Sequence, residues 1–365
     1  MIRALIASVL LLTARPALAL EDADYSAAVT ATAQGVIIPA YQALGRAAED
    51  LRADLDALCK APDAATLNQA RARFAEIAAA WARVQFISFG PISEHQRGFR
   101  IEYWPDKRNV VGRQLADVLA KQDEGALKPT RFATTTVGVQ GLPALERLLF
   151  EEDALAKLAA DDAGAQFRCG LLAAIGANIG SIAQDTINGW TEGDGSFLAR
   201  IQHPSAEDEE FPTGRDVAGR VLNDLLTSTI AMRDMKLLAA LGDNLEKAKP
   251  KAAEFWRSGQ SAAMLAANLQ GLRALFGTTD GIGGLLAAQP EGKAVTERVL
   301  ATIDQAITTV EQLRLPLHEA VADAAQRKQV EQLAEEQLVQ IRDLLSGPVA
   351  TKLNLPIGFN ALDGD

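Results

Sequence analysis

Apolar side chains recur along this chain at steps of three and four residues, the spacing that places side chains on one face of an α-helix. No convincing run alternates apolar and polar residues, which is the spacing of a half-buried strand. Stripes with the helical spacing occupy residues 41–58, 74–84, 167–190, 295–317 and 330–344. The pattern therefore predicts an all-α protein with few strands.

A polar interruption divides these stripes into two halves. The segment 193–215 combines glycines, prolines and an acidic run, and such clusters mark loops and linkers. We therefore expect an N-terminal helical bundle at 20–192 and a C-terminal bundle at 216–365, packed together as is natural for amphipathic helices of this length. Trp81 and Trp256 both lie near the second helix of their half, which suggests a distant internal duplication.

Residues 1–19 have the features of a cleaved secretory signal peptide. Arg3 provides a positive start, residues 4–12 are apolar or small, and residues 17–19 have the small-x-small pattern that signal peptidase reads. A transmembrane anchor is the alternative, but the apolar run is too short to span a bilayer. We expect cleavage after Ala19, export to the periplasm and no membrane span in the mature chain.

Composition and charge narrow the classes of partner. Hydrophobic residues make up 48% and charged residues 23%, as is usual for globular proteins. Removing the leader with its Arg3 and Arg15 shifts the formal net charge from −11 to −13. An acidic surface repels the phosphate backbone of nucleic acids and anionic lipid headgroups. Nucleic acid and membrane surfaces are therefore poor partners, whereas a metal ion or an envelope protein remains a candidate.

The chain has two cysteines, Cys59 and Cys169, both near predicted helix ends. In an oxidising compartment an isolated pair is usually joined. We therefore expect a disulfide between them, and two buried free thiols are the alternative.

Two segments are richer in special residues than helix packing requires, and the first lies in a loop. It gathers Arg100, Trp104 and Asp106 within a few positions, together with a proline. Loops that carry such groups often carry function. The structural alternative is that Trp104 covers the end of a bundle, while Arg100 and Asp106 make structural hydrogen bonds.

The second segment contains Gly141, Pro143 and Glu146. Pro143 suits the first turn of a helix, where the dipole also favours the carboxylate of Glu146. The functional interpretation is that Glu146 is aimed into a pocket, with Gly141 allowing backbone or ligand to come close. We expect Glu146 and the Arg100–Asp106 loop to face one groove between the bundles, where Arg100 could neutralise Glu146 or hold an anionic ligand.

Six short segments, spread over nearly the whole mature chain, match a known family. They are Phe89-Gly90-Pro91, Trp104-Pro105-Asp106, Gly141-Leu142-Pro143-Ala144-Leu145-Glu146, Phe255-Trp256 with Ser258 and Ser261, Asn268-Leu269-Gln270-Gly271-Leu272 and Gly358-Phe359-Asn360-Ala361-Leu362-Asp363-Gly364-Asp365. In these segments the chain resembles the imelysin-like proteins, which are named for a proposed class of metallopeptidases. The resemblance implies an envelope or periplasmic protein with two helical-bundle domains, often linked to iron supply.

One position departs from the family pattern, which carries Gly-x-His-x-x-Glu. Gly141 and Glu146 match it, but Pro143 stands in place of the histidine. Because proline cannot ligate a metal, the proposed metal site does not carry over intact, and the chain resembles an imelysin-like subgroup without the peptidase motif. Glu146 and Asp106 remain weak candidates as oxygen ligands for iron or another divalent cation. The further acidic candidates are Glu102, Asp363 and Asp365.

Three classes of function remain open. The resemblance favours a binding or accessory protein of the envelope, linked to uptake of iron or another metal and without peptidase activity. A ligand-free interaction scaffold is the alternative. A metallopeptidase is least favoured, because zinc catalysis needs about three protein ligands. None of His95, His203 and His318 shows the His-x-x-x-His spacing of zinc peptidases.

Overall fold

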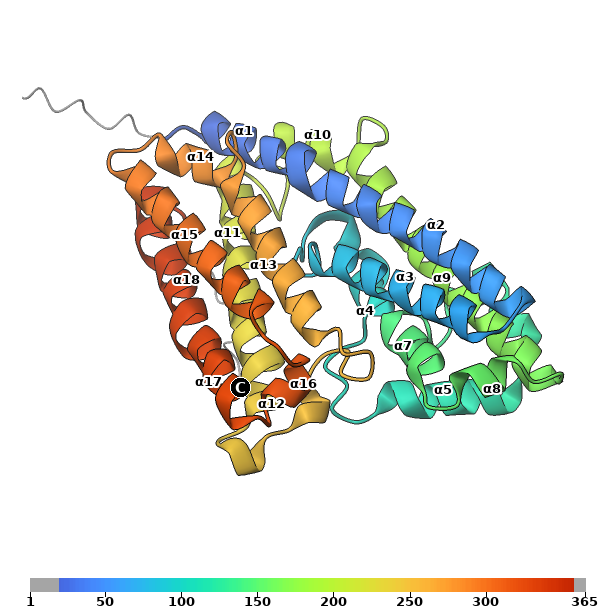
Figure 1. Cartoon of the computed structure of the whole chain (residues 1–365). Helices are drawn as coiled ribbons and strands as arrows, with labels where there is room; N and C mark the ends of the chain where they lie inside the picture. Colours follow the sequence, from blue (N-terminus) through green and yellow to red (C-terminus); the bar gives the residue numbers. More distant parts are fainter. Residues whose placement is uncertain (1–19, 358–365) are drawn as a thin grey trace, which may run out of the picture.

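The structure is a computed structural model that describes residues 20–357. Within this range the chain forms helices and no strand (Figure 1), so the predicted all-α class is confirmed. No helix in the described part is long and apolar enough to cross a membrane. The leader at 1–19 and the acidic candidates Asp363 and Asp365 lie outside the described residues.

The helices lie in two groups, side by side in Figure 1. The first group contains α2 (Ile38–Lys60), α3 (Ala64–Ala82), α4 (Arg97–Ile101), α5 (Val110–Lys121), α6 (Pro129–Phe132), α7 (Leu142–Phe150), α8 (Ala154–Leu158) and α9 (Ala163–Thr191). The second group contains α1 (Asp22–Thr32), α11 (Gly214–Ala231), α12 (Ala239–Leu241), α13 (Ser261–Gly277), α14 (Ile282–Ala287), α15 (Gly292–Glu311), α16 (Leu317–Ala320), α17 (Ala324–Gln332), α18 (Leu338–Leu344) and α19 (Ala350–Lys352). Between the groups, α10 (Phe197–Gln202) contacts α9, α1 and α11.

Shorter helical pieces join or continue these helices. Short 3₁₀ segments are η2 (Gly90–Gln96), which is kinked, η3 (Glu124–Leu127), η4 (Val137–Val139), η6 (Leu245–Lys247) and η7 (Pro250–Ala252). Wider π-helical turns are η1 (Ala33–Ile37), η5 (Met232–Leu238), η8 (Leu333–Gln337) and η9 (Leu345–Val349).

The predicted apolar stripes form the core. The stripe of α2 packs against α3 and α9, and it is buried along its length at Tyr41, Leu44, Ala48, Leu51, Leu55 and Leu58. The stripe at 295–317 is the exception, because it is shared by two helices: α15 ends at Glu311, and α16 begins at Leu317. Pro316 explains the break, since a proline disfavours the helical conformation in the residue before it.

The first helix of the described residues joins the two groups. α1, η1 and α2 follow one another without a break, yet α1 packs against α11 and α14 of the second group. The hydroxyl of Tyr25 also donates a hydrogen bond of 2.7 Å to the carbonyl oxygen of Leu353. The boundary at 193–215 and the internal duplication stay predictions, and the packing adds that residues 22–32 lie with the C-terminal half.

The segment predicted as a linker is itself packed. It contains α10, whose Phe197 lies with its ring centroid 4.8 Å from Trp190 and 5.9 Å from Phe89. Phe211, later in the segment, is also buried against Phe197 and Phe89. Its polar composition therefore does not make this segment a free tether, because a few aromatic residues anchor it.

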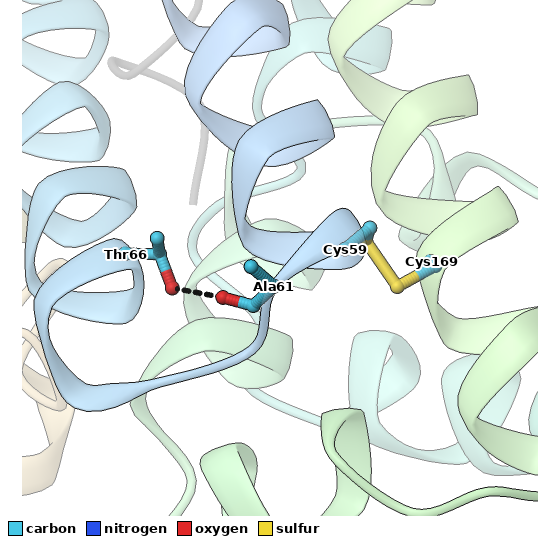
Figure 2. Close-up of a disulfide and its surroundings, with 4 residues drawn as sticks. All are labelled: Cys59, Ala61, Thr66 and Cys169. Atoms are coloured by element: carbon cyan, nitrogen blue, oxygen red, sulfur yellow. Dashed lines mark hydrogen bonds between the residues drawn. A yellow bond between two sulfur atoms is a disulfide. The ribbon is translucent and has the colours of Figure 1, made fainter.

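A disulfide ties α2 to α9, as Figure 2 shows. Cys59, at the end of α2, is bonded to Cys169 near the start of α9, which confirms the predicted pair. The turn that follows α2 is closed by the hydroxyl of Thr66, which donates a 2.9 Å hydrogen bond to the carbonyl oxygen of Ala61. Asp63 caps the N-terminus of α3 by accepting from the Thr66 amide.

The two groups meet where α13 crosses the end of α3. The amide of Asn268 donates a 2.6 Å hydrogen bond to the carbonyl oxygen of Ala82, one of the groups that a helix end leaves unpaired. A β-carbon at Gly271 would clash with the carbonyl oxygen of Arg83. Asn268 and Gly271 thus permit two backbones to come close at this crossing.

A second link joins α11 to the chain before η2. Buried Asp224 accepts hydrogen bonds from the amide (2.7 Å) and the hydroxyl (2.6 Å) of Ser88. Burial raises the pKa of Asp224 to about 6, although the Ser88 hydrogen bonds and nearby Arg220 oppose the rise.

Replacing both Cys59 and Cys169 with serine is expected to lower the free energy of unfolding. The cysteines are 110 residues apart, and in the chain-entropy model a loop of this length contributes about 4–5 kcal/mol. Urea denaturation of the oxidised protein and the double variant measures the difference. Reduced wild-type protein is the control and should match the variant; a change below about 1 kcal/mol would contradict the expected role of the bond.

Asp224→Asn is expected to remove a pH dependence of stability. The folded-state pKa of about 6 lies above the ordinary value of 3.8. The protonated carboxyl therefore stabilises the fold fully below pH 3.8, and this contribution is lost as the pH rises through about 6. Between pH 4 and 7 the wild type should lose on the order of 3 kcal/mol more stability than the variant.

Chemical denaturation across this pH range measures the Asp224 effect. Asp117→Asn is a matched control, because Asp117 is an exposed aspartate on α5. Equal pH profiles for wild type and Asp224→Asn would show that burial does not perturb this carboxyl group.

Candidate functional site

Segments from both groups of helices enclose a cavity of about 300 Å³. The first group contributes the loop before α5 with the start of α5, and the first turns of α7; the second contributes η5, α12, η7 and the chain that follows η7. The lining residues used below are Trp104, Asp106, Lys107, Pro143, Glu146, Arg147, Lys251, Trp256 and Arg257. Three of the predicted site residues, Trp104, Asp106 and Glu146, therefore share one cavity.

Glu146 joins the two groups at this cavity. It is the fifth residue of α7 and is 3% exposed. Its Oε1 atom accepts hydrogen bonds from the amide and the hydroxyl of Ser258, both at 2.9 Å. Burial raises the pKa of Glu146, while the Ser258 hydrogen bonds and the charges of Arg257 and Arg147 act in the opposite direction. Glu146 thus holds the chain around Ser258, which accounts for the serine in the Phe255-Trp256 motif.

Gly141 does not line the cavity, but it sets the position of α7, which does. A β-carbon at this position would clash with the carbonyl oxygens of Ile101 and Arg100. The close approach that needs glycine here is therefore made by backbone, and it sets the start of α7 against the end of α4.

Arg100 does not reach the cavity either. Its guanidinium donates to the side-chain oxygens of Gln140 (2.8 Å) and Asn178 (2.9 Å), both in the first group. The guanidinium beside Glu146 belongs instead to Arg257, with 3.9 Å between Nη1 and Oε2. The prediction that Arg100 neutralises Glu146 was therefore wrong. Arg100 is turned toward α9, and Arg257 lies beside Glu146 instead.

Asp106 has a structural role at the cavity wall. Its two carboxylate oxygens accept hydrogen bonds from the amides of Val110 (2.6 Å) and Val111 (3.0 Å) at the start of α5. A carboxylate at this position satisfies amides that a helix N-terminus leaves unpaired and favours the helix dipole. The oxygens that were candidate metal ligands are therefore already engaged.

Trp104 and Met235 line both this cavity and a second one of about 430 Å³. Glu102 lines the second cavity and is buried, accepting hydrogen bonds from the Trp81 indole (2.8 Å) and from Gln85 (2.7 Å). Burial and the neighbouring carboxylate of Glu254 raise the pKa of Glu102 well above its usual range. Burial and a like charge therefore both disfavour the ionised form that a cation ligand needs.

A buried lysine connects Glu102 to the second group. Lys236 on η5 is 2% exposed and donates to Glu254 (2.7 Å), Asn268 (2.6 Å) and Gln85 (2.8 Å). Gln85 donates in turn to Glu102 (2.7 Å) and Glu254 (3.1 Å). Lys236 and Glu254 were not predicted from the sequence; the only signal was that Lys236 stands between the apolar residues Met235 and Leu237.

Positive side chains around the cavity were also missed. Lys107, Arg147, Lys251 and Arg257 all line it. Arg257 lies with its guanidinium carbon 4.4 Å from the ring centroid of Trp256, and the Lys251 ammonium lies 5.3 Å from the same ring. Such contacts are attractive because the ring face is negative. The position of Arg257, directly after the Phe255-Trp256 motif, was the signal that could have found it.

The residues present do not fit a metal ion. Among residues 20–357 no group of three or more histidines, cysteines, aspartates or glutamates is arranged to hold one. Pro143 lines the cavity without a ligating atom, Asp106 is engaged with amides, and Glu146 faces Ser258 and Arg257.

Comparisons with known proteins agree on fold and family. An imelysin-like protein from Psychrobacter arcticum 273-4 has a similar solved structure, with a TM-score of 0.75 and 22% identity, covering 93% of this chain and 98% of its own. A "putative iron-regulated protein A precursor" from Parabacteroides distasonis ATCC 8503 has a TM-score of 0.75 and 14% identity, covering 92% and 96%. No curated protein matches the chain. The family model described as Imelysin (Peptidase_M75) matches residues 37–345, and this chain therefore belongs to the imelysin family.

Proposed function

We propose that this protein is a binding or accessory protein of the bacterial envelope, exported to the periplasm and linked to the uptake of iron or another metal. In this proposal it has no peptidase activity, and the cavity between the two groups of helices is its ligand site. The leader-like features of residues 1–19 support export. The link to iron is supported by the description of the Parabacteroides protein as iron-regulated.

The proposal depends on one observation: three of the family motifs meet at the wall of the same cavity. Glu146, from the Gly141–Glu146 motif, contacts Ser258 of the Phe255-Trp256 motif at the wall of one cavity. Trp104, from a third motif, lines the same cavity. Helix packing needs apolar side chains, whereas this cavity is lined by charged and aromatic side chains from both groups of helices. Cavities at such junctions are common ligand sites.

The family name makes a metallopeptidase the competing function. A catalytic zinc needs about three protein ligands and an open position. Pro143 lies in the cavity at the position where the family pattern has histidine, and it offers no ligand. The chemistry of the residues in place therefore favours binding over hydrolysis.

Glu146→Gln is expected to weaken ligand binding about tenfold or more while unfolding stays cooperative. Glutamine keeps one acceptor for Ser258 but loses the charge that faces Arg257, so the chain carrying Trp256 and Arg257 is held less firmly. Thermal shift with ferrous ion, zinc, citrate, ferric citrate and inorganic phosphate identifies a binding probe. Calorimetry with that probe then measures the affinity.

Glu246→Gln is the matched control for Glu146→Gln, because Glu246 is an exposed glutamate in η6. It should bind the probe like the wild type. If no probe raises the melting temperature, the ligand-free scaffold becomes the better account of the fold.

Peptidase activity is expected to be absent from the purified protein. The test is digestion of an unfolded protein substrate with and without added zinc. Pro143→His is an informative second variant, because it restores the motif of the family. Cleavage by the wild-type protein that a chelator stops and zinc restores would contradict the proposal.

A further inference from the structure

We propose that the cavity between the two groups of helices binds a small oxyanion with two or more negative charges, such as a polycarboxylate or phosphate, and not a bare metal cation. This inference rests on the proposed binding function of the same cavity. It concerns the charge and chemical class of the ligand, which the family resemblance leaves open.

The charged side chains around the cavity are mostly positive. Four cationic residues line it, Lys107, Arg147, Lys251 and Arg257, against two acids, Asp106 and Glu146. The protein as a whole has the opposite balance, with a formal net charge of −11. A local positive cavity on an acidic protein attracts anions to that place and repels cations from it.

Both acids are already satisfied by donors of the protein. Asp106 accepts two amide hydrogen bonds from the start of α5, and Glu146 accepts two from Ser258. Burial raises the pKa of Glu146, and the Ser258 hydrogen bonds and the charges of Arg257 and Arg147 oppose the rise. Two acids therefore offset the four surrounding cations only in part, and neither is free to coordinate a hard metal ion.

The cations have little compensation within the described residues. Lys107 and Lys251 are exposed and form no ion pair among residues 20–357, and Arg147 donates to a neutral partner, the side-chain oxygen of Asn109 (2.6 Å). Arg257 lies 3.9 Å from Glu146, which is too far for a hydrogen bond. The pKa of Arg257 is lowered by burial and then by the neighbouring charge of Arg147, and the charges of Glu146 and Asp106 offset this only in part. A bound anion would relieve this repulsion, since it accepts from both.

Aromatic side chains form part of the cavity wall. They suit a ligand whose charged groups are attached to a carbon skeleton. Tyr103, Trp104, Phe255 and Trp256 line the cavity. Trp256 also restrains Arg257 and Lys251 by stacking, so fewer rotamers are lost when they bind an anion. A guanidinium presents paired donors that match a carboxylate or phosphate. For a metal-supply function, this chemistry favours metal carried as an anionic chelate.

Calorimetry at about 0.05 M salt tests the inference with citrate, ferric citrate and inorganic phosphate, against ferrous ion and zinc alone. We expect at least one of the anions to bind and the bare cations not to bind. Raising the salt to about 0.3 M should lower the affinity for the anion, because salt screens the charges of the cavity. The relative affinities for citrate and phosphate distinguish the two sources of oxyanion.

Lys251→Gln and Arg257→Gln should each lower the affinity for the bound anion about tenfold or more. Arg257→Lys should retain part of the affinity, because it keeps the charge and loses the paired donors. Lys249→Gln and Arg298→Gln are matched controls, since both side chains are exposed and lie outside the cavity lining. Melting temperatures establish that each variant is folded.

The outcomes separate this inference from the proposed function. Binding of a bare cation that depends on Glu146, without anion binding, would overturn the inference and leave the binding function in place. Equal losses in the cavity variants and the matched controls would also overturn it, because the anion would then be attracted by overall charge. Binding of neither class would remove both the inference and the proposed function.

Discussion

The two groups of helices depend on one buried charge at their junction. Lys236 is 2% exposed, and its three hydrogen-bond partners come from both groups. A buried ammonium without partners is strongly unfavourable, and breaking such a pair typically costs about 3–5 kcal/mol. Its partners Gln85 and Glu254 come from different groups and must both reach the ammonium. The network therefore fixes the register between α3 and the second group. Because Glu254 is followed directly by Phe255, Trp256 and Arg257, the same register places one wall of the cavity.

Neighbouring contacts reinforce this placement from either side. Asn268 and Gly271 bring α13 onto the end of α3, and Glu146 holds Ser258 from the other side of the cavity. These residues belong to motifs that are far apart in the sequence. Their shared location gives a physical reason for the resemblance to the imelysin-like proteins: the motifs form the junction between the groups and the cavity at that junction.

The chemistry of the cavity comes from the pairing of the two groups. α7 contributes a carboxylate, which by itself suggests a cation site. The second group surrounds it with Arg257 and Lys251, and the first adds Lys107 and Arg147. This excess of positive side chains is what favours the anionic ligand that we propose over a metal cation. Membership of the family therefore does not by itself determine the chemical class of the ligand.

Local patterns in the sequence were enough to predict the helices, because steps of three and four residues are a property of a single helix. They were also enough for the disulfide pair, since only two cysteines were available, and for Trp104, Asp106 and Glu146 as cavity residues. The tertiary structure alone decided the contacts between distant segments. It placed α1 with α11, turned Arg100 toward Gln140 and Asn178, and brought Arg257 to Glu146. The spacing of residues in the sequence does not predict these pairings. They result from how whole helices pack and from which buried charges must be paired.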